Sequence, residues 1–262
     1  MPGTKVSRDQ LQIICHRYQF ASKFVSEKEV LEVGCGPSLG LGYLSKNAKR
    51  VVGGDITQNS LIYAQKHYNG RVGLVSMDAH KLPFRDSCFD VVIAVATIIY
   101  LDLSIFFDEC HRVLKKGGVL ILNTPNKDIP NFQGSCLSKN YFRAPELFAL
   151  LNRHHFDAEF FGAFPILKKP LTETFIRAWG GKVLHMVPKE RVIRKFIGHI
   201  INGRNLILNA ELDDELIKNT NVENIKLKHL PHNSLDFQHR ILYVIGHSRE
   251  SEKVQYDGGI SL

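Results

Sequence analysis

The sequence lacks any long uncharged apolar run. Across its 262 residues no stretch reaches the roughly 20 apolar residues that a transmembrane helix needs. Its first nine residues also lack the charged-then-apolar pattern of a signal peptide. These absences predict a cytoplasmic protein without a membrane span. Attachment to an anionic membrane surface is compatible with the composition, but no feature predicts it.

Cysteine is scarce as well. The five cysteines are odd in number, widely spread and form no C-x-x-C pair. A disulfide framework or a zinc site needs paired or clustered ligands. The neighbouring His154 and His155 do not supply them, because adjacent residues on a helix point in different directions. We therefore expect reduced thiols and no metal site.

Charge is abundant but unevenly placed. The formal net charge is +8, and residues 168–204 alone hold nine Lys and Arg against two Glu. Such a segment can contact nucleic acid, an anionic membrane or an acidic small substrate, or it can be a helical cap with a solvated face. Because it lies outside the segment that carries the clearest motifs, charge alone does not choose between these functions.

Short apolar runs alternate with amphipathic stretches between residues 29 and 124. This alternation is typical of an α/β fold in which helices cover both faces of a parallel sheet. The apolar runs predict strands at 30–33, 50–54, 72–77, 89–95 and 119–122, and the amphipathic stretches predict helices at 39–47, 58–68 and 102–114.

The flanking segments predict the domain organisation. Residues 7–24 have helical spacing, and 157–164 and 241–246 are typical of strands. We expect one ligand-binding domain from residues 1–165 and 236–250, and a basic, mainly helical insertion or cap from residues 166–235.

Two glycines follow the first predicted strand. Gly34 and Gly36 allow a tight strand-to-helix turn and a close approach of ligand to backbone. In a dinucleotide site a third glycine stands at the position that Leu39 occupies here. The pyrophosphate fingerprint is therefore not met, which disfavours a nicotinamide-dependent oxidoreductase.

Acidic residues end the next two strands. Asp55 is placed to accept hydrogen bonds from a ribose diol, and Asp78 from an exocyclic adenine amine. Because the carboxyl ends of parallel strands meet at one edge of a sheet, these groups predict an adenosine site.

The motifs after Asp78 resemble class I S-adenosylmethionine-dependent methyltransferases, in the subgroup with Asp-x-x-x-Leu-Pro-Phe followed by Phe-Asp-Val-Val. Here these are Asp78, 82–84 and 89–92, and residues 109–118 resemble the family's helix and turn before its fifth strand. The resemblance implies a Rossmann-like sheet of seven strands, mostly parallel with an antiparallel strand near its edge. It also implies S-adenosylmethionine as cofactor and S-adenosylhomocysteine as product.

The same resemblance implies which residues bind the cofactor. An Arg-Tyr pair precedes the first strand, and Arg17 is expected on the methionine carboxylate. The glycine loop would hold the methionine part of the cofactor. The end of the second strand would bind the ribose and the end of the third strand the adenine. Ala94 would lie beside the sulfonium. The implied set is Arg17, Tyr18, Glu32, Gly34, Gly36, Asp55, Ile56, Asp78, Ala79 and Ala94.

The catalytic chemistry is less defined. Tyr100 stands where many relatives have histidine, and His80 and Tyr141 are the other candidates for a base or a substrate-orienting group. For each of the three, packing or loop structure is the alternative. The sequence therefore predicts no definite catalytic residue.

These observations predict methyl transfer to a small-molecule acceptor, acidic compounds included, by in-line displacement. O-, N- and C-methylation are not distinguished, and the oligomeric state is not predicted. A nucleic-acid methyltransferase using the basic insertion is disfavoured, since Ala96 to Ile99 stand where Asp/Asn-Pro-Pro-Tyr/Phe is expected. A regulatory protein that binds the cofactor without turning it over is the other alternative.

Overall fold

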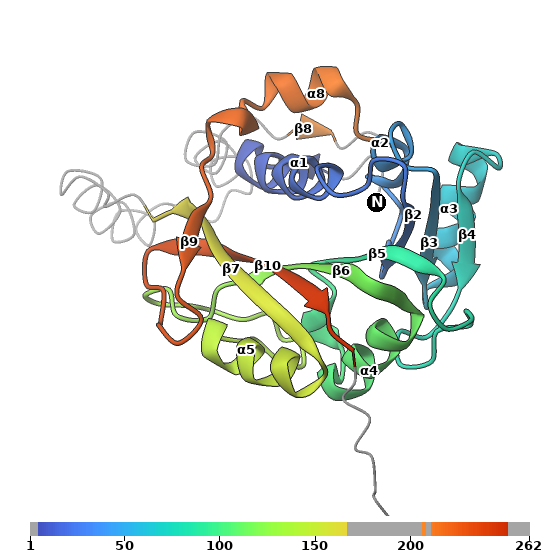
Figure 1. Cartoon of the computed structure of the whole chain (residues 1–262). Helices are drawn as coiled ribbons and strands as arrows, with labels where there is room; N and C mark the ends of the chain where they lie inside the picture. The colour runs from blue at the N-terminus through green and yellow to red at the C-terminus, as the bar shows by residue number, and fades with distance from the viewer. Residues whose placement is uncertain (1–4, 167–205, 208–210, 251–262) are drawn as a thin grey trace, which may run out of the picture.

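A sheet of eight strands forms the centre of the molecule (Figure 1). The computed structural model describes residues 5–166, 206–207 and 211–250. The strand order in the sheet is β4-β3-β2-β5-β6-β10-β7-β9. The strands are β2 (Glu29–Val33), β3 (Arg50–Asp55), β4 (Gly73–Ser76), β5 (Phe89–Val95), β6 (Leu114–Pro125), β7 (Phe156–Pro165), β9 (Lys228–Leu230) and β10 (His239–Ser248).

The strand directions confirm the mostly parallel sheet. Strands β4, β3, β2, β5 and β6 run parallel, and β10 is antiparallel to both β6 and β7. The strand count differs from the seven expected, because β9 pairs antiparallel with β7 and adds an eighth strand. This strand falls within the 166–235 segment that was expected to be mainly helical.

Helices cover both faces of the sheet (Figure 1). One face carries α1 (Arg8–Ser22), α2 (Leu41–Ser45), α3 (Gln58–Tyr68) and α8 (Asp214–Asn219). The other carries α4 (Leu103–Val113) and α5 (Ala144–Arg153). Each face has its own apolar core, because the strands alternate their side chains between the two. We call these the α1 face and the α4 face.

Helix starts follow local capping chemistry. Ser7 and Gln10 form a capping box at α1, where the Ser7 hydroxyl accepts from the Gln10 backbone N–H at 3.2 Å and Gln10 Oε1 accepts from the Ser7 N–H at 3.0 Å. Asp102 caps α4 by accepting from the backbone N–H of Ser104 at 3.0 Å. These caps fix where both helices begin, one residue after each cap.

The described part of the predicted insertion packs back onto the domain. Strand β8 (Leu206–Ile207) pairs with β1 (Lys5–Val6), and the short helix η2 (Val222–Asn224) follows α8. The Leu212 backbone N–H donates to the Leu39 carbonyl at 2.8 Å, which joins this segment to the glycine loop region. The predicted basic stretch 188–201 lies outside the described residues.

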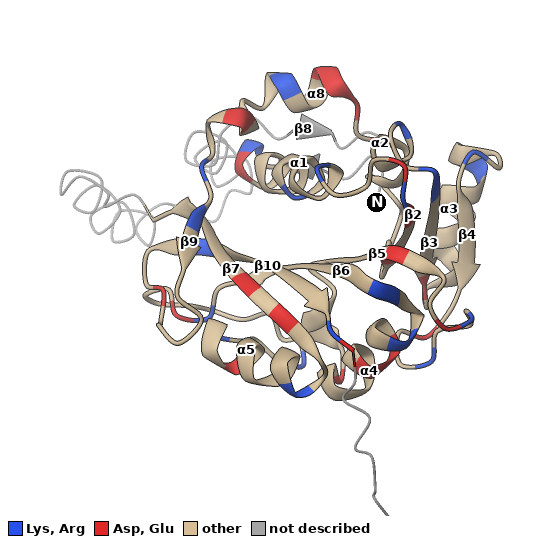
Figure 2. Cartoon of the chain, viewed as in Figure 1, with Lys and Arg blue, Asp and Glu red and all other residues tan. Residues whose placement is uncertain are grey.

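Charge in the described part is mixed. Figure 2 shows basic and acidic residues interspersed over α8 and around β7 and β9. The local excess of Lys and Arg belongs to residues 168–204, of which none is described. None of the described helices combines the length and apolar character needed to cross a bilayer.

A buried amide joins the end of β6 to the start of β10. Asn126 Nδ2 donates to the backbone carbonyls of Asp236 at 2.6 Å and His239 at 2.8 Å. Asn126 Oδ1 accepts from the Asp128 N–H at 3.0 Å, and the side chain is fully buried. This amide therefore fixes two loops at the carboxyl edge of the parallel strands.

Replacing Asn126 with Ala should destabilise the protein. The change leaves two buried carbonyls without their donor, which costs about 2–3 kcal/mol of unfolding free energy. Urea unfolding measures the loss. The exposed Asn140→Ala is the control and should change stability by less than about 0.5 kcal/mol. Equal effects of the two variants would contradict this role of Asn126.

Candidate functional site

The glycine loop after β2 needs residues without a side chain. Gly34 has φ 72°, and a Cβ there would lie 2.3 Å from the Thr97 side chain. Gly36 has φ 53°. Both values lie in the left-handed region that glycine adopts without strain. The loop can therefore turn sharply and keep its backbone accessible at the carboxyl edge of the sheet.

Asp55 at the end of β3 holds this loop in place. Its Oδ2 accepts from the Gly36 backbone N–H at 2.8 Å, and its Oδ1 accepts from the Thr57 N–H at 2.7 Å. A carboxylate offers about four acceptor positions. Asp55 can therefore order the loop and still accept hydrogen bonds from a ligand.

A cavity of about 520 Å³ opens beside this loop. Seven of the predicted residues line it, as do further residues that the sequence did not single out, including Met77, Thr97 and Lys139. The structure thus brings the ends of β2, β3, β4 and β5 together around one cavity, as expected for this sheet topology. The seven predicted residues are Gly34, Asp55, Ile56, Asp78, Ala79, His80 and Tyr100.

Asp78 and His80 form a fixed pair at the rim. Asp78 Oδ1 accepts from the His80 backbone N–H at 2.9 Å and from its Nδ1 at 2.8 Å. The hydrogen bond from the His80 backbone, with smaller contributions from the His80 side chain and Lys139, lowers the pKa of Asp78. His80 Nε2 accepts from the Asp102 N–H at 3.0 Å, so both ring nitrogens are engaged. This geometry favours a structural link to α4 over a role for His80 as base.

The remaining catalytic candidates are separated. Tyr100 is 46% exposed at the rim of the cavity. Tyr141 does not line it; its hydroxyl accepts from the Ser135 N–H at 2.8 Å and donates to Ser138 Oγ at 3.0 Å within the loop after β6. Tyr141 therefore has a structural role in this loop, and Tyr100 is the candidate that faces the cavity.

Ala94 is placed differently from the sequence expectation. Its side chain is fully buried in the apolar core of the α4 face and does not line the cavity. The residue of this segment that lines the cavity is Thr97, whose Oγ1 donates to the Gly34 carbonyl at 3.3 Å. The chain turns between them at Ala96, which has φ 54°.

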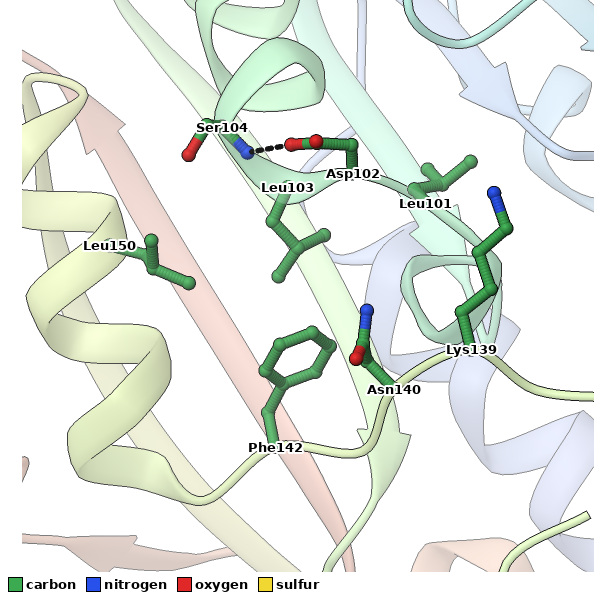
Figure 3. A pocket seen from close by; sticks show the side chains of 8 residues that line it. All are labelled: Leu101, Asp102, Leu103, Ser104, Lys139, Asn140, Phe142 and Leu150. Atoms are coloured by element: carbon green, nitrogen blue, oxygen red, sulfur yellow. Dashed lines mark hydrogen bonds between the residues drawn. The ribbon is translucent and has the colours of Figure 1, made fainter.

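A second hollow of about 310 Å³ adjoins the first, and Figure 3 shows its side chains. Leu101 and Lys139 line both, so these two residues separate the hollow from the cavity. Leu103, Phe142 and Leu150 form its apolar wall between α4 and α5. The dashed bond in Figure 3 is the Asp102 cap of α4.

Glu32 and Tyr18 meet beneath the glycine loop, on the α1 face. The Tyr18 hydroxyl donates to Glu32 Oε1 at 2.7 Å, and both side chains are buried. Burial raises the pKa of Glu32 to about 8, partly offset by the Tyr18 hydrogen bond. Glu32 Oε2 is buried and has no hydrogen-bond partner among the described residues.

Arg17 brings the opposite charge to the same face. Its side chain is 91% buried, and its Nε likewise has no hydrogen-bond partner in the described part of the chain. Burial lowers the pKa of Arg17, while the phenols of Tyr243 and Tyr18 counteract this shift. A buried guanidinium Nε–H and a buried carboxyl oxygen that have no partner among the described residues are costly unless a ligand completes them. The carboxylate and ammonium of an amino acid match them.

Asn123 is a polar residue of this region that sequence reasoning missed. It is fully buried near the end of β6, and its Nδ2 has no partner among the described residues. The sequence feature that could have identified it is a single amide residue directly after the apolar run 119–122. Val95 lies beside it in the register of β5, and Tyr243 in that of β10.

Comparison with known proteins agrees with this geometry. Residues 31–122 match the family described as methyltransferase domain. A Mycolicibacterium smegmatis protein named as a probable S-adenosylmethionine-dependent methyltransferase is 34% identical over 111 residues, 42% of this chain and 43% of that protein. A fatty-acid O-methyltransferase from the same species is 33% identical over 115 residues, 42% of each chain.

The fold is similar to that of solved structures. A SAM-dependent methyltransferase from Archaeoglobus fulgidus superposes with a TM-score of 0.56 at 18% identity, over 92% of this chain and 95% of that one. The chain spans less than half the length of the curated relatives it matches. Residues 31–122 are thus similar to S-adenosylmethionine-dependent methyltransferase domains, and the fold of the chain is Rossmann-like.

Glu32→Gln should change the pH dependence of stability. A carboxyl whose folded pKa is raised to about 8 stabilises the fold fully below its unfolded value of 4.5, and this stability is lost as pH rises through 8. Glutamine mimics the neutral form. The melting temperature of the ligand-free variant should therefore be above that of wild type at pH 9 and close to it at pH 5. Each kcal/mol of added unfolding free energy raises the melting temperature by about 2–4 °C.

Thermal unfolding at the two pH values measures this effect. Glu159→Gln, on the half-exposed side of β7, is the matched control and should show no such pH-dependent gain. A melting-temperature difference for Glu32→Gln that is the same at pH 5 and pH 9 would show that Glu32 is not the buried neutral carboxyl described here.

Proposed function

We propose that this protein transfers the methyl group of S-adenosylmethionine to a small-molecule acceptor. The observation that carries the proposal is that two buried polar atoms, Arg17 Nε and Glu32 Oε2, have no hydrogen-bond partner among the described residues. Glu32 is followed directly by Val33 and Gly34, which line the cavity. The chain therefore offers partners for an amino acid next to a space for an adenosine.

Each part of the cofactor has an assigned partner in this proposal. Arg17 binds the methionine carboxylate, and Glu32 accepts from the ammonium group with the oxygen that Tyr18 leaves free. Asp55 accepts from the ribose hydroxyls, and Asp78 accepts from the adenine amine. All of these residues lie within the predicted ligand-binding domain of residues 1–165 and 236–250.

The bound cofactor supplies an activated methyl group on a sulfonium. The chain's own task is to align the acceptor with that group and to exclude water, which together account for much of the rate in such displacements. Thr97 and Gly34 both line the cavity near the turn after β5, where the Thr97 hydroxyl donates to the Gly34 carbonyl at 3.3 Å. No acid–base pair is required of the protein if the acceptor is already ionised.

The acceptor that fits best is an acidic small molecule. A carboxylate is nucleophilic at neutral pH without a base, and His80, the candidate base, has both ring nitrogens engaged. The name of the fatty-acid O-methyltransferase relative supports the same class of acceptor. We therefore propose O-methylation of a carboxylate on an apolar chain.

Asp55→Ala should weaken cofactor binding. The variant loses charge-assisted hydrogen bonds to the ribose and releases the Gly36 N–H of the loop, which should weaken S-adenosylhomocysteine binding about 10- to 100-fold. Calorimetric titration measures this affinity. Asp157→Ala, an exposed carboxylate on β7, is the control and should bind as wild type does.

Two results would contradict the proposal. Absence of S-adenosylhomocysteine binding by the wild-type protein would remove the cofactor site altogether. Unchanged binding by Asp55→Ala would show that the ligand lies elsewhere than in the cavity described.

A further inference from the structure

Lys139 is a cationic side chain in the lining of the cofactor cavity that the proposed cofactor contacts do not use. It lies in the loop after β6 and lines the cavity together with Asp78. Its backbone is held in place, because the N–H groups of Lys139 and Asn140 donate to the Ile99 carbonyl at 2.9 and 3.1 Å. Figure 3 shows the side chain extending toward Leu101, which lines the same cavity. The loop therefore places an ammonium group at the wall where the adenine is proposed to bind.

Asp78 keeps one carboxylate oxygen for a ligand. The two hydrogen bonds that its carboxylate accepts from described residues both come from His80, and both end on Oδ1. The pKa of Asp78 is lowered by these hydrogen bonds and, through charge alone, by Lys139. Asp78 Oδ2 and the Lys139 ammonium are thus an acceptor and a donor that lie near one another without being hydrogen-bonded.

The edge of an adenine ring carries the matching groups. Its exocyclic amine donates hydrogen bonds, and the ring nitrogens N1 and N7 on either side of the amine accept them. An ammonium group has three donors and no acceptor, so Lys139 can bind a ring nitrogen but not the amine. Asp78 Oδ2 can bind the amine but not an unprotonated ring nitrogen. Ala79 and Leu101, which are buried apolar residues of the same lining, suit a flat ring between these two groups.

We propose that Lys139 Nζ donates a hydrogen bond to one of the two ring nitrogens beside the adenine amine of the cofactor. This inference rests on the proposed function and adds a residue of the loop after β6 to the adenine contacts. Lys139 and Asp78 together then select an aminopurine over an oxopurine. In an oxopurine a carbonyl oxygen replaces the amine, and this oxygen would face the Asp78 carboxylate without a hydrogen between them.

The experiment removes each ring nitrogen in turn. The full chain is titrated calorimetrically with S-adenosylhomocysteine and with its 1-deaza and 7-deaza forms, in which a C–H group replaces N1 or N7. Wild type should bind the form that lacks the partner of Lys139 about threefold to tenfold more weakly than the parent ligand. Lys139→Met has no donor, so it should bind S-adenosylhomocysteine more weakly by a similar factor and should show no further loss with that deaza form.

Two further variants make the test specific. Lys139→Arg keeps a cationic donor and should retain the penalty for the same deaza form. Lys127→Met makes the same chemical change as Lys139→Met at an exposed position of the same loop, outside the lining of the cavity. It should bind all three ligands as wild type does.

A fourth ligand tests the selection of the base. S-inosylhomocysteine has an oxopurine in place of adenine. Wild type should bind it at least about tenfold more weakly than S-adenosylhomocysteine, because its carbonyl oxygen faces Asp78. Equal affinities for these two ligands would show that Asp78 and Lys139 do not select the base.

The other outcomes separate this inference from the proposed function. If wild type fails to bind S-adenosylhomocysteine, the proposed function fails and this inference with it. If wild type binds S-adenosylhomocysteine and both deaza forms equally well, or if Lys139→Met keeps the full penalty of wild type for each form, Lys139 does not bind a ring nitrogen. Loss of all binding in Lys139→Met would also overturn the inference, because Lys139 would then support the cavity itself.

Discussion

The burial of Glu32 is the constraint on which the site depends. Its carboxyl is fully shielded by α1, and the Tyr18 hydroxyl satisfies only one of its oxygens. Arg17, on the same helix, is buried without a partner for its Nε among the described residues. Helix α1 thus buries polar groups among its apolar contacts, at positions where apolar side chains would be more stable. The cost is explained if a zwitterionic ligand completes both groups.

Asp55 couples loop order to ligand binding in a similar way. Its carboxylate already accepts from the Gly36 and Thr57 amides, so the loop has its shape before a ligand arrives. Preorganisation of this kind lowers the entropy that binding must overcome. The same carboxylate retains acceptor positions toward the cavity. One side chain therefore orders the glycine loop and, in the site that we propose, also accepts from the ribose.

Much of this arrangement could be predicted from the sequence. The strand ends at Gly34, Asp55 and Asp78 are marked by apolar runs of strand length, and parallel topology brings such ends together. Strand β9 could not be predicted, because three residues show no period and their pairing with β7 is a tertiary contact. The position of Ala94 depends on which face its strand presents to the core, which local sequence does not determine.

The site that we propose depends on Arg17, which binds the carboxylate of the methionine part of the cofactor. The most direct test is calorimetric titration of wild type and Arg17→Met with S-adenosylhomocysteine and with methylthioadenosine, which has the same adenosine and thioether but no amino acid. Arg17→Met should weaken S-adenosylhomocysteine binding at least tenfold, the equivalent of about 1.4 kcal/mol, and should leave methylthioadenosine binding unchanged. Equal losses for both ligands, or no loss for either, would contradict it.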